Sequence, residues 1–309
     1  MPRAPASSRR SSSPRKADPV VAPILEDART ARRRGHPRGL TAPESLDRWC
    51  ADFFDVASGW WSTPAIGPED ERRVRLLRSV APGPGRVLEL GCGTGATAVA
   101  TALAGYAVTG IDVSEVRTAK AEERLTALQE ADGETPAIRP FFRRADFYTT
   151  ELAGTFDVVT CWNGFGVGTD DNQRHLLRRI ATEWLDPEGV LIMDVYSPWR
   201  WASMHGQSHE YRDLVCENRF DPVESRFEER WWRREDPDTV ISQYGRCYSP
   251  VDFLALVNGL GLEVTEFRMT DMAFGVGAAD TALASALLDR WDYTVVLRRG
   301  SELSGRNSP

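Results

Sequence analysis

The chain has 309 residues, of which 41% are hydrophobic and 27% are charged, and its formal net charge is −7. This composition is typical of a globular protein with a sizeable core, and it excludes collagen-like and wholly disordered chains. No apolar run reaches the roughly 20 residues that a membrane span needs, and no signal-peptide core follows the start. We therefore expect a cytoplasmic protein without a membrane partner. Five cysteines without a Cys-x-x-Cys pair argue against a disulfide framework and a zinc site, and no metal is expected.

The first 40 residues differ from the rest in composition, because serine, proline and arginine dominate and ten basic residues stand against three acidic ones. A segment this polar buries too little apolar surface to fold, so we predict a disordered basic tail over residues 1–40. A nucleic-acid-binding arm is the less favoured alternative, because no aromatic residue lies between the arginines and the rest of the chain is acidic.

Residues 41–85 are predicted to form a helical cap. An amphipathic helix opens at Thr41 with Pro43 in its first turn, and a second helix spans 69–80 before a turn rich in proline and glycine. Trp60 and Trp61 follow the first helix. They are candidate lid residues over a ligand, and plain packing against the sheet is an equal alternative.

Residues 86–198 alternate between apolar runs and amphipathic stretches, which predicts parallel strands joined by helices that cover both faces of a sheet. In such a sheet a ligand lies outside the carboxyl ends of the strands. The predicted strands are 86–90, 107–111, 137–142, 156–162 and 189–196, and the predicted helices are 96–104, 114–130 and 171–184.

The alternation breaks at residues 199–248, where three β-rich stretches, 211–216, 225–232 and 239–248, predict an inserted antiparallel sheet. Since this insert follows the fifth strand, we expect it to cover the same rim as a substrate lid. An oligomer contact or a simple flap is the alternative. Residues 249–309 then complete the central sheet with a helix from Ser249, strands over 262–269 and 291–298, and a helix over 281–288 between these strands.

The loop after the first strand carries the most specific pattern of the chain, Glu89-Leu90-Gly91-Cys92-Gly93-Thr94-Gly95. Its glycines permit a tight turn and let the backbone touch a ligand. A glycine-rich turn by itself also fits a dinucleotide or a phosphate, but Glu89 would repel a pyrophosphate and welcome a cationic amino group. Asp112 ends the next strand, 21 residues after Gly91, within reach of two ribose hydroxyls.

At these residues the chain resembles the class I S-adenosylmethionine-dependent methyltransferases of the small-molecule type. Five landmarks occur in the family's order between residues 86 and 198, ending with the fourth strand and the 185–193 segment. The resemblance implies a Rossmann-like, seven-stranded, mostly parallel α/β sheet with helices on both faces. The N-terminal helices and the inserted antiparallel β lid predicted above complete the expected fold. The cofactor it implies is S-adenosylmethionine, with S-adenosylhomocysteine as product.

The resemblance also implies roles for individual residues. Glu89 lies near the methionine amino group, the loop contacts the cofactor through its backbone, Asp112 binds the ribose, and Asp146 with Phe147 binds the adenine. The full set of expected cofactor contacts is Glu89, Gly91, Cys92, Gly93, Gly95, Asp112, Val113, Asp146, Phe147 and Trp162.

The acceptor is less defined. Asn163, after the fourth strand, is a candidate for facing the substrate, and His205 and His209 of the insert are candidate general bases. The segment after Trp162 lacks the Asn/Asp-Pro-Pro-aromatic pattern of enzymes that methylate amino groups of nucleic acids or proteins. We therefore expect methylation of a nitrogen or oxygen of a small molecule, such as an aromatic or amine-bearing secondary metabolite. An RNA or protein methyltransferase, a non-catalytic cofactor-binding module and a homo-oligomer stay open.

Overall fold

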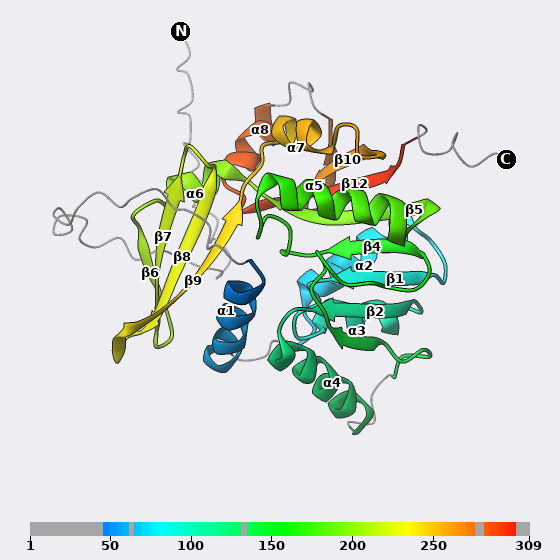
Figure 1. The fold of residues 1–309 in the computed structure, drawn as a ribbon, viewed down its shortest axis with the longest axis horizontal. Helices are drawn as coiled ribbons and strands as arrows, with labels where there is room; N and C mark the ends of the chain where they lie inside the picture. The colour runs from blue at the N-terminus through cyan, green and yellow to red at the C-terminus, as the bar shows by residue number, and fades with distance from the viewer. Residues whose placement is uncertain (1–45, 62–64, 131–134, 276–280, 301–309) are drawn as a thin grey trace, which may run out of the picture. The chain divides into compact units, whose positions relative to one another are not determined.

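A computed structural model describes residues 46–61, 65–130, 135–275 and 281–300. The predicted tail, residues 1–40, lies outside the described residues. Figure 1 shows a central sheet covered by helices, a second sheet beside it, and one helix, α1, between the two.

The central sheet has eight strands in the order β11-β10-β12-β5-β4-β1-β2-β3. Their bounds are β1 Arg86–Leu90, β2 Ala107–Asp112, β3 Phe141–Arg144, β4 Phe156–Cys161, β5 Leu185–Tyr196, β10 Leu262–Met269, β11 Met272–Phe274 and β12 Asp292–Arg299. Strands β5, β4, β1, β2 and β3 are parallel, whereas β12, β10 and β11 add antiparallel pairs. The mostly parallel sheet is confirmed, with the three-residue strand β11 added to the seven predicted strands.

Helices cover both faces of this sheet, as predicted. On one face α2 (Pro68–Val80), α3 (Ala96–Leu103) and α4 (Glu115–Glu130) enclose a core that includes Val87 and Val108. On the other face α5 (Asp170–Arg179) and α7 (Pro250–Val257) enclose a core around Leu88 and Leu90. Successive strand residues point to opposite faces, so Glu89 shares the α2 face with Val87. None of the helices in the described ranges combines the length and the apolar character needed to cross a membrane.

The second sheet has four antiparallel strands in the order β6-β7-β8-β9 and follows helix α6 (Pro198–Ser203). Its strands are β6 Ser208–Tyr211, β7 Leu214–Asp221, β8 Arg226–Arg233 and β9 Asp236–Arg246. The predicted single strand 211–216 is wrong, because Arg212 adopts a left-handed φ of 57° and turns the chain between β6 and β7. The turn carries no Asn-Gly or Asp-Gly signal, which is why the sequence did not reveal it.

Other boundaries also differ from prediction, and β5 begins at Leu185 and not at residue 189. Strand β3 begins at Phe141 and not at residue 137, because Pro140 has no N–H to give to a strand ladder. Helix α5 ends at Arg179 and continues as a π-helical turn, Ile180–Trp184. Helix α8 (Thr281–Leu288) lies in the range predicted for it.

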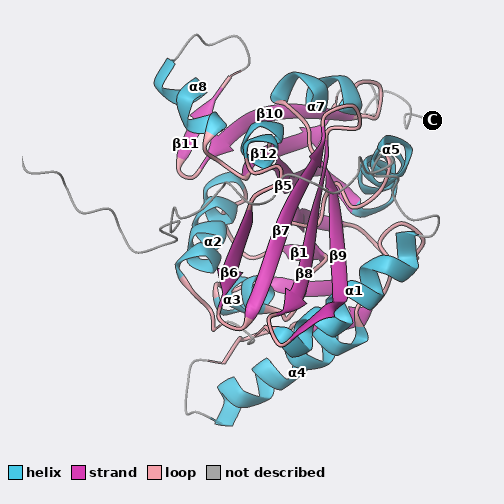
Figure 2. Cartoon of the chain, turned by 90° about the vertical axis from the view of Figure 1, so that its left-hand side faces the viewer, coloured by secondary structure: helices cyan, strands magenta, loops and turns pink. Residues whose placement is uncertain are grey.

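Helix α1 (Leu46–Trp60) connects the two sheets. It packs on α4 of the central domain and on β9 of the insert, and Figure 1 shows it in the space between them. Its residues Phe53 and Ala57 share a buried apolar cluster with Leu214 and Trp231 of the insert. Figure 2, from the insert side, shows the long strands β7, β8 and β9 in front of the central domain. The insert and α1 thus stand at the end of the central sheet where the parallel strands terminate.

Candidate functional site

The loop after β1 is a tight backbone turn. Gly91, Gly93 and Gly95 have φ values of 69°, 53° and 74°, in the left-handed region that favours glycine. The N–H of Cys92 donates to the carbonyl of Ile111 on β2 at 3.0 Å, which fixes the loop against the neighbouring strand. The next residues begin α3, so the loop presents backbone groups at a helix N-terminus.

Glu89 is buried beside this loop, with 3% of its surface exposed. Its Oε2 has no hydrogen-bond partner among the described residues, and the nearby Arg73 binds Asp194 at 3.2 Å and Thr97 at 3.2 Å instead. Burial raises the pKa of Glu89 to about 8, against the attraction of Arg73. The site therefore holds a carboxyl group that lacks a partner for its charge.

Asp112 closes the other side of the loop. Its carboxylate accepts hydrogen bonds from the N–H groups of Gly93 at 2.8 Å and Ser114 at 2.9 Å, and 5% of its surface is exposed. Burial raises the pKa of Asp112, while Arg117 and these two N–H groups oppose that rise. The two hydrogen bonds at the end of β2 thus fix the position of both the loop backbone and the Asp112 carboxylate.

Asp146 and Phe147 follow β3 on the same rim. The carboxylate of Asp146 accepts the N–H of Tyr148 at 2.8 Å, and the Phe147 ring meets that of Tyr148 edge to face at 4.7 Å. At the end of β4, Trp162 is 6% exposed and its ring lies under the guanidinium of Arg73, 5.0 Å from the centroid. Asn163 then turns the backbone with a φ of 54°.

These residues surround one cavity of about 690 Å³. All but one of the expected cofactor contacts line it, namely Glu89, Gly91, Cys92, Gly93, Asp112, Val113, Asp146, Phe147 and Trp162, and the acceptor candidate Asn163 does so too. Gly95 does not line it, because it starts α3 and packs against Ala121 and Phe142 below the loop. The volume suits a nucleotide-sized ligand with room for a second molecule.

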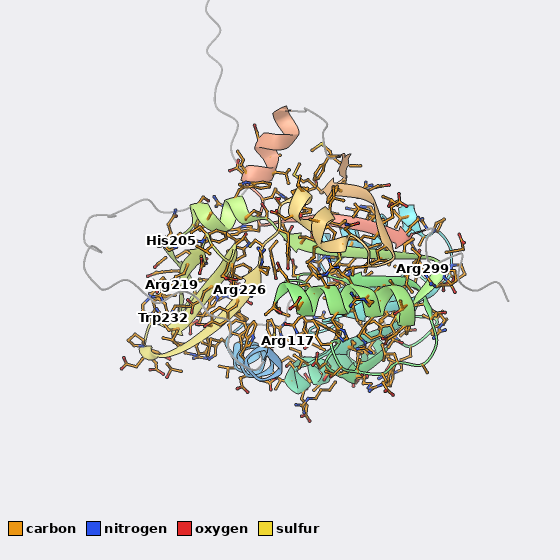
Figure 3. All side chains as sticks on the ribbon, turned by 45° about the horizontal axis from the view of Figure 1, so that its top comes forward. Arg117, His205, Arg219, Arg226, Trp232 and Arg299 are labelled. Carbon is orange, nitrogen blue, oxygen red and sulfur yellow. The ribbon has the colours of Figure 1, made fainter. Side chains whose placement is uncertain are left out.

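Helix α1 forms one wall of the cavity and is held by side-chain contacts to residues at the start of α4. The hydroxyl of Ser114 donates to Asp55, Lys120 donates to the carbonyl of Ser58, and Arg117 stacks over the ring of Phe54 at 4.0 Å. Figure 3 shows Arg117 next to this helix. Trp61 also lines the cavity and packs edge to face on Trp231 of the insert at 5.1 Å, so the position of Trp61, but not that of Trp60, fits a lid residue.

Tyr196 at the end of β5 and Gln243 on β9 also line the cavity. The hydroxyl of Tyr196 donates to the carbonyl of Asn163 at 2.7 Å. Sequence reasoning missed Asp70, Arg73, Arg117, Tyr196 and Gln243. Their positions depend on how α2, α4 and the insert dock, and no local pattern of the sequence marks them.

The two histidines do not lie at this cavity. His205 accepts the N–H of Phe220 through Nδ1 at 2.9 Å, and His209 contacts Asn218 at 3.2 Å and the ring of Trp231. Figure 3 shows His205 on the insert, well separated from Arg117. Both rings stabilise the insert, so their position gives no support to a role as general base.

The sequence pattern of the methyltransferase domain family matches residues 69–266. The chain belongs to this methyltransferase family. Among curated relatives, the cypemycin N-terminal methyltransferase of a Streptomyces species is 30% identical over 171 residues, which cover 55% of this chain and 63% of that protein. The ubiquinone biosynthesis O-methyltransferase of Albidiferax ferrireducens is 30% identical over 116 residues, covering 36% of this chain and 44% of that protein.

The chain spans about half the length of the first curated relatives that it matches. Among solved structures, the CcbJ methyltransferase of Streptomyces caelestis superposes with a TM-score of 0.64 at 19% identity, covering 82% of this chain and 99% of that chain. At this identity the likeness establishes the fold.

Proposed function

We propose that this methyltransferase transfers a methyl group from S-adenosylmethionine to a nitrogen or oxygen of a small-molecule acceptor. The observation that carries the proposal is the buried carboxyl of Glu89, whose Oε2 has no hydrogen-bond partner in the described part of the chain and which lines a cavity next to a glycine turn. A cationic amino group is the ligand part that such a carboxyl lacks. Glu89 would hold that group of the cofactor, Asp112 its ribose, and Asp146 with Phe147 its adenine.

When bound, S-adenosylmethionine supplies a methyl group that is already activated by the sulfonium charge. The protein must then position the acceptor in line and exclude water. Helix α1 and the insert, residues 199–248, are suited to this because both wall the cavity through Phe54, Trp61 and Gln243. We assign the insert the role of a lid over the acceptor. The division into five segments, a cytoplasmic location and a homo-oligomer stay predictions.

The function is tested by calorimetry with S-adenosylhomocysteine and by mass spectrometry of acceptors incubated with S-adenosylmethionine. We expect binding of the homocysteine product and a mass gain of one methyl group on a small molecule. Binding without transfer to any acceptor of a broad panel would favour a non-catalytic module. Binding of NAD in place of S-adenosylhomocysteine would overturn the proposal.

The pH dependence of cofactor binding provides a further prediction. In the free protein Glu89 has a pKa of about 8, so it is protonated at pH 6 and must lose that proton to pair with an ammonium group. Affinity for S-adenosylhomocysteine should therefore rise about tenfold per pH unit from pH 6 to 7.5 and level off above 8. Calorimetry at pH 7 in two buffers of different ionisation enthalpy should detect release of close to one proton.

The variant Glu89→Gln should bind the product weakly and without this pH slope. A wild-type affinity that stays constant between pH 6 and 8 would contradict the assignment. The free protein should also lose stability as pH rises from about 4.5 to 8, because only the unfolded chain ionises Glu89 in that window.

A further inference from the structure

The insert holds a hydrogen-bonded pair of polar side chains, one of which lines the cavity. Gln243 on β9 lines the cavity and is the register partner of Glu229 on β8. The amide Nε2 of Gln243 donates to Oε2 of Glu229. Because Nε2 faces the carboxylate of Glu229, Oε1 of the amide points away from it. Among the described residues, no donor gives a hydrogen bond to this oxygen. Gln243 thus offers a hydrogen-bond acceptor at the cavity.

Glu229 has no cationic partner within the described part of the chain. Its side-chain contacts are the Gln243 amide, the Trp231 indole and the Cys216 thiol at 3.8 Å, none of which carries a positive charge. The nearby arginines of the sheet, Arg219 and Arg230, bind Glu217 at 3.2 and 2.8 Å on the opposite face. Burial raises the pKa of Glu229, against the hydrogen bond from Gln243. This buried carboxyl thus has no ion-pair partner among the described residues, and it lies directly behind Gln243, which lines the cavity.

On the basis of the methyl transfer proposed above, we propose that Gln243 and Glu229 recognise the amino group of the acceptor, which makes the substrate an amine. Gln243 accepts an N–H through Oε1, and Glu229 orients the amide and supplies the compensating negative charge. Gln243 is the residue that touches the acceptor, and Glu229 is a positioning residue.

The charges of the site favour an amine over a hydroxyl acceptor. Tyr196 shows how a phenol behaves there, because burial and then the charges of Asp292 and Glu229 raise its pKa well above the usual range. A phenol acceptor would equally resist losing its proton, and among the described residues that line the cavity there is no histidine to remove it. An ammonium acceptor first releases one proton to water, and the neutral amine then uses its lone pair to form the N–C bond as the C–S electrons move to sulfur. The new positive charge appears on nitrogen, next to the carboxylate, and nitrogen then releases a proton to water.

Aromatic rings flank the pair. Tyr196 and Trp61 line the cavity. The ring of Trp61 contacts that of Trp231, which lies two residues after Glu229 on the same face of β8. Such rings attract a cation and pack on a flat apolar body. An aryl-alkyl amine is accordingly a suitable probe for the site.

The experiment compares benzylamine, benzyl alcohol and benzoate as ligands of the protein saturated with S-adenosylhomocysteine, measured by ligand-observed NMR titration. We expect benzylamine to bind about tenfold or more tightly than the other two, the size expected of one charge-assisted hydrogen bond. Glu229→Gln and Gln243→Leu should each abolish this preference. Glu217→Gln is the matched control, because it removes the same charge from the opposite face and should keep the preference.

Equal or tighter binding of benzyl alcohol or benzoate, or no binding of benzylamine, would overturn the proposal. So would a preference that survives Glu229→Gln. Affinity for S-adenosylhomocysteine, measured first on every variant, separates this proposal from the function itself. If the wild type does not bind S-adenosylhomocysteine, the proposed function is refuted. If it binds S-adenosylhomocysteine but does not prefer benzylamine, only the amine site is refuted.

Discussion

Replacing Asp112 with alanine is expected to weaken the binding of S-adenosylhomocysteine about a hundredfold, the size of two lost hydrogen bonds to a charged group. In the proposed complex the carboxylate binds both ribose hydroxyls, and in the free protein it already holds the N–H groups of Gly93 and Ser114. The fold should persist, because burial of this acid disfavours its charged form and its removal relieves that cost. Calorimetry measures the affinity and thermal unfolding monitors the fold.

Asp157→Ala is the matched control for this variant. Asp157 is also an acid that accepts a backbone N–H next to a central strand, from Arg86 at 2.7 Å, but it lies at the other end of the sheet. Its removal should leave product affinity within about twofold, since it cannot reach the cavity. An Asp112→Ala protein that binds as tightly as the wild type would refute the ribose assignment.

The second large effect concerns the fold beneath the loop. Gly95→Ala should lower the free energy of unfolding by about 2–5 kcal/mol, combining left-handed strain with overpacking. A Cβ at Gly95 would lie 2.8 Å from the Cβ of Ala121 and 2.9 Å from the ring of Phe142. Because α3 and α4 are packed on either side, neither neighbour has free space to move. Urea unfolding of the two proteins measures the difference.

Gly259→Ala separates the two causes. Gly259 has a φ of 73° against 74° for Gly95, and nothing lies within 4 Å of the Cβ it would gain. This variant should lose only the strain, about 1–2 kcal/mol. Equal losses in both variants would show that packing at Gly95 contributes nothing, contrary to the distances in the structure.

The sequence alone predicted the parallel sheet, because short apolar runs that alternate with amphipathic helical stretches are typical of parallel strands buried on both faces. It also placed Glu89, Asp112 and Asp146 together, since each lies within two residues of the carboxyl end of a strand and parallel strands share one rim. These signals are local, because each is contained within a few residues. They do not depend on how the segments outside the sheet are arranged. The family comparison bears out the class of protein that they indicated.

The histidines and the insert show where local signals fail. A strand exposes alternate residues on opposite faces, so the function of Glu229 depends on register, and a shift by one residue would exchange it with Glu228. The turn at Arg212 likewise sets the register between β6 and β7 without a recognisable motif. Local signals also did not show that His205 and His209 make contacts within the insert, whereas Gln243 lines the cavity.

The sequence by itself thus determined the glycine turn, the rim of acids and the methyl donor that they suit. Only the tertiary structure decided that Arg73 is engaged by Asp194, which leaves Oε2 of Glu89 without a hydrogen-bond partner among the described residues. It also decided that α1 and the insert line the cavity and that Gln243, bound to Glu229, reaches it. The physical reason is distance along the chain. The rim is made by strand ends that a parallel sheet must align, whereas the acceptor wall joins segments more than 100 residues apart whose docking depends on packed surfaces.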